Sequence, residues 1–92
     1  MINLTQKTYS EINKDLAARL AKIRKRKKIS QQELSIRSGV SYASLRRFEN
    51  SGEISLASLA KLAIALDLDD ELDNLFTHVP FDSIEEIIRG QD

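Results

Sequence analysis

The 92-residue chain contains no cysteine, no tryptophan, one proline, three glycines and one histidine. Without cysteine it forms no disulfide, which is consistent with a reducing compartment, and it offers no His/Cys cluster of zinc ligands. No apolar run approaches the roughly 18 residues needed to span a bilayer. The N-terminal segment MINLTQKTYSE lacks the basic start and the apolar stretch of a signal peptide. We therefore expect a cytoplasmic protein without a membrane partner.

Catalytic signatures are also absent from the sequence. There is no glycine-rich phosphate loop and no nucleophile motif, and the single histidine, His78, is expected at the surface near Pro80. The acidic run over residues 67–73 lacks the glycine-centred spacing of a calcium loop, and acidic residues are ordinary at the start of a helix. We predict a protein that is not an enzyme and has neither metal nor cofactor.

The charges are balanced in number but separated along the chain. Residues 1–50 hold 12 Lys/Arg and 4 Asp/Glu, a net charge of +8, whereas residues 51–92 hold 2 and 10, a net charge of −8. Such separation gives the protein an electrostatic field with a direction, which steers its basic face toward phosphate. The overall neutrality therefore does not exclude a nucleic-acid partner.

Capping residues and apolar spacing predict one small all-α domain of five helices. Thr8 with Glu11 and Ser30 with Glu33 have the spacing of a capping box. Apolar residues at helical spacing follow each cap. The helix after Ser55 carries apolar residues on two sides and is expected to be covered on both. The predicted helices span residues 9–27, 31–38, 42–49 and 56–66, with a fifth from residue 69 or 70 through Phe76.

Residues 30–50, SQQELSIRSGVSYASLRRFEN, predict two short helices around one tight turn. Gly39 suits the left-handed conformation that ends the first helix, Ser41 caps the second, and the small Ser35 lets the two helices approach closely. Such a bend presents a second helix to the DNA major groove. The alternative is an ordinary helical hairpin, against which the charge separation argues. The contacts that fix the bend are expected from Leu34, Val40, Leu45 and Phe48.

This pattern resembles the Xre/lambda-repressor-like family of helix-turn-helix transcription regulators over roughly residues 16–76. The resemblance implies a compact five-helix DNA-binding domain at 1–76, with its helix-turn-helix at 31–49. It also implies that an arginine at the position of Arg24 pairs with Glu49 as a structural salt bridge. The matching residues are Gln31, Leu34, Ser35, Gly39, Val40, Ser41, Leu45, Phe48, Glu49 and Asn50.

The second helix of the motif divides into two faces at 100° per residue. Leu45 and Phe48 define its buried face, so the arginines on the opposite face are available for guanine O6 and N7. In the resembling repressors, base contacts come from the positions of Tyr42, Ala43 and Arg47. Tyr42 departs from the glutamine often seen there, so phosphate contact or stacking is as well supported as base reading. The predicted base contacts are Tyr42, Ala43, Arg46 and Arg47; the predicted phosphate contacts are Gln31, Ser41, Ser44, Asn50, Ser51, Lys25, Lys27 and Lys28.

Residues 77–92 form a C-terminal extension beyond the family pattern. Pro80 breaks the chain and Asp82 with Glu85 makes another capping box, so a short helical segment is expected to dock on the core or to form a dimer. The predicted dimer or partner surface comprises Leu72, Leu75, Phe76, Phe81, Ile84, Ile87 and Ile88.

These observations predict a sequence-specific DNA-binding regulator that acts as a homodimeric repressor on double-stranded DNA. The alternative is an antitoxin, which would bind a toxin protein through its acidic half from Glu53 onward and repress its own operon. A neighbouring toxin gene or a co-purifying protein would distinguish the two.

Overall fold

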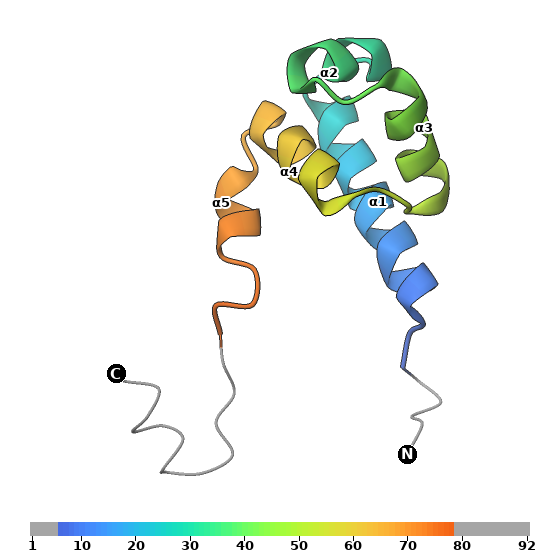
Figure 1. The fold of residues 1–92 in the computed structure, drawn as a ribbon, viewed down its shortest axis with the longest axis vertical. Helices are drawn as coiled ribbons and strands as arrows, with labels where there is room; N and C mark the ends of the chain where they lie inside the picture. The colour runs from blue at the N-terminus through green and yellow to red at the C-terminus, as the bar shows by residue number, and fades with distance from the viewer. Residues whose placement is uncertain (1–5, 79–92) are drawn as a thin grey trace.

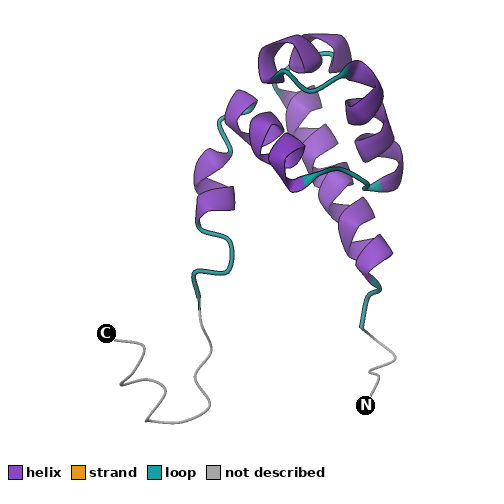
Figure 2. Ribbon diagram, in the orientation of Figure 1, coloured by secondary structure: helices purple, strands orange, loops and turns teal. Residues whose placement is uncertain are grey.

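The computed structural model describes residues 6–78 as five helices without a strand (Figures 1 and 2). They are α1 (Tyr9–Arg26), α2 (Gln31–Ser38), α3 (Tyr42–Ser51), α4 (Leu56–Ala65) and α5 (Asp69–Asp73). The predicted all-α fold is confirmed, and the helix boundaries lie close to those expected except at α5. The predicted cap at Asp82 and the surface residues Phe81, Ile84, Ile87 and Ile88 lie outside the described residues.

Three of the predicted helices are capped at their N-termini by the side chains that the sequence indicated. Thr8 and Glu11 make the complete capping box of α1: the Thr8 hydroxyl accepts the Glu11 backbone N–H at 3.2 Å, and the Glu11 carboxylate accepts that of Thr8 at 3.4 Å. Ser41 and Ser55 each accept the N–H three residues ahead, both at 3.1 Å. A cap of this kind stabilises a helix by about 1 kcal/mol, so these boundaries are set locally.

The capping box predicted at Ser30 is only half present. The Ser30 hydroxyl accepts the Glu33 backbone N–H at 3.0 Å. The Glu33 carboxylate instead accepts a hydrogen bond from Arg37 one turn along α2, at 2.7 Å. An i,i+4 ion pair on the helix surface thus takes the carboxylate that the box would have used.

The core lies where α1 packs against α3, and α2 packs against α3 and α4, while α5 contacts α4 (Figure 1). Each large apolar side chain that is fully buried here contributes about 1.5–3 kcal/mol. All four side chains that were expected to fix the bend of the motif belong to this core. Its buried members are Ala17, Leu20, Ile29, Leu34, Val40, Leu45, Phe48, Leu62 and Leu66.

The expectation that α4 is covered on both sides is wrong for the described part of the chain. Leu62 and Ala63 face the core, whereas Leu56 is 76% exposed and Ile64 is 63% exposed. The reason is that α2 packs on one side of α4 only, and the short α5 leaves much of the other side open.

The fifth helix is also shorter than predicted. It ends at Asp73, and the Asn74 backbone and side-chain amides that follow both donate to the Asp70 carbonyl, at 3.0 and 2.8 Å. Leu75 and Phe76 lie beyond the helix and are exposed, and Phe76 has a positive φ of 62°. Within residues 6–78, an apolar surface along α4 and α5 is therefore left exposed.

Candidate nucleic-acid interface

The turn between α2 and α3 is closed by its own polar groups. Gly39 adopts the left-handed conformation, with φ 76° and ψ 8°, and donates its N–H to the Ser35 carbonyl at 3.0 Å. The Ser35 hydroxyl then donates to the Val40 carbonyl at 2.6 Å, while the Val40 side chain is buried. Ser35, which was predicted to let the two helices approach closely, thus also forms a hydrogen bond across the turn. This bond fixes the direction of α3 relative to α2.

Helix α3 has the two faces that its sequence predicts. Leu45 and Phe48 are essentially inaccessible to solvent. The side chains expected to read DNA lie on the other face, because 100° per residue places them away from this pair. The exposed residues there are Ala43, Arg46, Arg47 and Asn50.

Tyr42 begins α3 at the flank of this exposed face and is 37% exposed. The guanidinium carbon of Arg46 lies 5.6 Å from the centroid of the Tyr42 ring, within the range of a cation–π interaction. The aromatic ring therefore restrains Arg46 at the surface of the helix.

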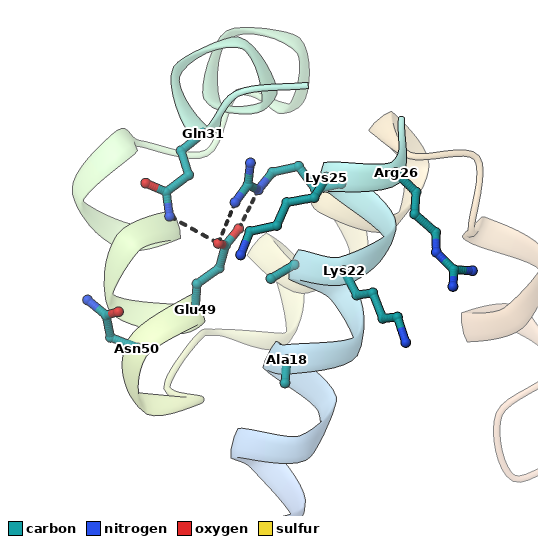
Figure 3. A pocket seen from close by; sticks show the side chains of 9 residues that line it. Ala18, Lys22, Lys25, Arg26, Gln31, Glu49 and Asn50 are labelled. Carbon is teal, nitrogen blue, oxygen red and sulfur yellow. Dashed lines mark hydrogen bonds and ion pairs between the residues drawn. The ribbon is translucent and has the colours of Figure 1, made fainter. Parts of the chain in front are cut away.

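A buried ion pair joins α3 to α1, as the family resemblance implied. The Arg24 guanidinium donates to both carboxylate oxygens of Glu49, at 2.8 and 2.9 Å, and to the Ile29 carbonyl at 2.8 Å. The two side chains are 9% and 7% exposed. Gln31, the first residue of α2, donates to the same carboxylate at 3.0 Å (Figure 3). Three helices are thus tied together directly behind the exposed face of α3.

A surface groove between α1 and the motif brings several of the predicted phosphate contacts together. Lys25, Gln31 and Asn50 all line it. In Figure 3 Lys25 extends toward Glu49 and α3, whereas Lys22 and Arg26, which also line the groove, extend away from Glu49. Of these three basic side chains, Lys25 is therefore the one directed toward the motif.

Lys27, predicted as a phosphate contact, is directed elsewhere. Its ammonium donates to the Leu66 carbonyl at 2.8 Å and lies 3.8 Å from the Asp67 carboxylate. The carbonyl end of a helix carries partial negative charge, and the C-terminus of α4 draws this lysine to it. We therefore exclude Lys27 from the proposed phosphate contacts.

Ser51, another predicted phosphate contact, completes the end of α3 instead. Its hydroxyl donates to the Arg47 carbonyl at 2.7 Å and accepts the Glu53 backbone N–H at 3.2 Å. A hydroxyl has a single hydrogen to donate, and that of Ser51 is used within the protein. We exclude Ser51 for this reason.

Glu53 is the residue at this site that sequence reasoning missed. Its carboxylate accepts hydrogen bonds from Nε, at 2.9 Å, and from Nη2 of Arg47. By sequence, Glu53 begins the acidic half of the chain that would bind a protein partner in the antitoxin alternative. The signal that points to this pairing is Gly52, because a left-handed residue at a helix end turns the following residue back along the last turn.

Within residues 6–78, no group of three or more His, Cys, Asp or Glu side chains is arranged to hold a metal ion. None of the five helices is both long and apolar enough to cross a membrane.

Comparison with known proteins adds a family assignment to this geometry. A family model described as helix-turn-helix matches residues 20–72, which is more than half of the chain and spans α2, α3 and α4 completely. No curated protein matches the chain. With the family model, the bonded turn and the two-faced second helix all in agreement, the chain belongs to the helix-turn-helix family of Xre-type DNA-binding transcription regulators.

Proposed function

We propose that this protein is a repressor that binds operator DNA as a homodimer, each copy placing α3 in the major groove. The observation that carries the proposal is the exposed face of α3. Two arginines project from it, and the buried Arg24–Glu49 pair fixes the helix from behind. A reading helix held in this way loses little conformational freedom on binding, which favours affinity.

Base reading is assigned to the first two turns of α3. Arg47 would donate a bidentate pair to guanine O6 and N7, and Ala43 would contact a thymine methyl group. Arg46 lies against Tyr42, so these two side chains would act together, the guanidinium toward a base or phosphate and the ring against the sugar–phosphate backbone.

Phosphate binding is assigned to the groove and to the start of each motif helix. Only one of the two amide hydrogens of Gln31 is used on Glu49, so the other remains for a phosphate beside the N–H groups that begin α2. Lys25 and Asn50 line the same groove. Ser41, another predicted contact, is excluded for the same reason as Ser51, because its hydroxyl hydrogen is donated to the Ser44 hydroxyl at 2.8 Å. The proposed contacts are Gln31, Ser44, Asn50, Lys25 and Lys28.

The experiment that tests this function starts from duplexes selected by the wild-type protein out of a random DNA pool. Arg47→Ala should weaken binding by about 1–3 kcal/mol and relax the preference at one base pair in each half-site. Lys25→Ala should weaken all duplexes alike and reduce the slope of log K against log salt by about one unit. A wild-type pool that shows no sequence preference would refute the proposed function.

The homodimer is assigned to the apolar surface along α4 and α5. Its apolar members are Leu56, Ala60, Ile64, Leu72, Leu75 and Phe76. A second copy is the proposed occupant, because a palindromic site needs two reading helices about 34 Å apart and a two-fold interface pairs the same patch with itself. The 14 residues after His78, which include the predicted interface residues Phe81, Ile84, Ile87 and Ile88, lie outside the described residues.

Light scattering on two full-length variants tests the dimer. Ile64→Glu places a charge in the apolar surface along α4 and α5, whereas Ile36→Glu makes the same change on α2, where the side chain is 83% exposed and lies outside that surface. We expect Ile64→Glu to shift the protein to the monomer and Ile36→Glu to leave the dimer intact. A wild-type protein that is monomeric at tens of micromolar and on DNA would refute the homodimer. The surface would then be assigned to a partner protein, as in the antitoxin alternative.

A further inference from the structure

We propose that Glu53 is a positioning residue that sets base specificity by holding Arg47 in the conformation that reads guanine. This inference rests on the proposed function, since it assigns a second residue to the same reading site. Nε and Nη2 of Arg47 both donate to one carboxylate oxygen of Glu53, although the two side chains are 71% and 61% exposed. An exposed arginine is thus already paired before any DNA is present.

The loop after α3 is built so that Glu53 reaches back to Arg47. Gly52 takes the left-handed conformation, with φ 82°, and its N–H donates to the Phe48 carbonyl at 2.8 Å. Ser51 bonds both the Arg47 carbonyl and the Glu53 N–H. The backbone of Glu53 is therefore fastened to the same helical turn that carries Arg47, and the ion pair does not depend on chance contact between two flexible side chains.

Glu53 occupies only one edge of the Arg47 guanidinium, so another edge remains for DNA. An arginine has five N–H donors arranged in a planar fork. Glu53 takes the edge formed by Nε and Nη2, and the edge formed by Nη1 and the second hydrogen of Nη2 points away from it. This remaining pair of donors matches O6 and N7 of guanine, so Arg47 can bind both partners at once.

Restraining Arg47 affects discrimination more than affinity. On a mismatched base pair, an unrestrained arginine turns to a nearby phosphate and recovers part of its interaction. An arginine paired with Glu53 must give up that ion pair to do so, which penalises the mismatch. Glu53 also neutralises a positive charge at the DNA surface, which weakens sequence-independent binding.

The test compares E53Q with E33Q on full-length protein, using the duplex selected by the wild type and its single-base-pair variants. Both substitutions remove one negative charge from an exposed Arg–Glu pair, and Glu33 pairs with Arg37 on α2. The relevant base pair is the one at which R47A relaxes preference. We expect E53Q to lower the discrimination there by about two- to tenfold, the contribution of one immobilised side chain. E33Q should leave it unchanged.

Thermal unfolding separates this role from a structural one. An exposed ion pair contributes little to folding, so the Tm of E53Q should stay within about 5 °C of the wild-type value. Discrimination that is unchanged in E53Q, or reduced equally in E33Q, would overturn the role of Glu53 while leaving the proposed function in place. Absence of any relaxed base pair in R47A would instead remove Arg47 as a reader, and the role of Glu53 with it.

Discussion

Gly52, at the end of α3, provides the sharpest test of how α1 and α3 pack. A Cβ atom added there would lie 2.7 Å from the carbonyl carbon of Asn13 and 2.9 Å from both its Cβ and its carbonyl oxygen. Gly39, at the end of α2, has a similar φ of 76° but no atom within 4 Å of an added Cβ. The two glycines therefore share a backbone conformation and differ in their surroundings.

The magnitude of each alanine substitution follows from this difference. An L-residue in the left-handed region costs about 1–2 kcal/mol, and for Gly39→Ala this should be the whole effect. Gly52→Ala adds overpacking, typically about 1–3 kcal/mol, since the obstacle is the backbone of α1 rather than a flexible side chain. The total of about 2–5 kcal/mol is a large part of the 5–15 kcal/mol that stabilises a typical domain.

Urea and thermal unfolding of the wild type and the two variants measure these losses. Because 1 kcal/mol shifts the Tm of a domain of 60–100 residues by about 4–8 °C, the two variants should differ by at least about 4 °C. Equal losses would refute the close approach of Gly52 to α1. They would also weaken the argument that this loop fixes the position of Glu53.

Two further predictions concern ion pairs, one buried and one exposed. Arg24→Met or Glu49→Leu alone should destabilise the protein by about 3–5 kcal/mol, since each leaves an uncompensated buried charge; the double variant should lose less than the sum, and additive losses in urea unfolding would contradict the pairing. Lys7 and Asp15 form an exposed ion pair. The hydrogen bond from Lys7 lowers the pKa of Asp15, and the positive charges of Lys7 and Arg19 act in the same direction. Any stability from this pair is therefore present above the ordinary aspartate pKa and is lost as the pH falls through the lowered value. NMR titration of Lys7→Gln should find the Asp15 pKa raised, and an unchanged pKa would exclude Lys7 as the cause.

The sequence by itself determined the first four helices and the motif. A capping side chain bonds an amide three residues away, and a left-handed glycine acts on its own turn, so Thr8, Ser41 and Gly39 specify local structure without help from the rest of the chain. The two faces of α3 follow in the same way from its periodicity. The Arg24–Glu49 pair spans 25 residues, and it was predicted because of the family resemblance.

Only the tertiary structure decided which partners the long polar side chains take and which apolar surface stays open. Lys27 bonds a carbonyl 39 residues away, and Arg47 bonds Glu53 across a loop. Both were predicted to bind DNA, and only Lys27 is excluded by the partner it takes; in each case that partner depends on which negative group the packing brings near the cation. Ile64 likewise has the pattern of a buried residue but is exposed. Its burial depends on which element packs against α4, and that is a property of the assembled fold rather than of any local segment.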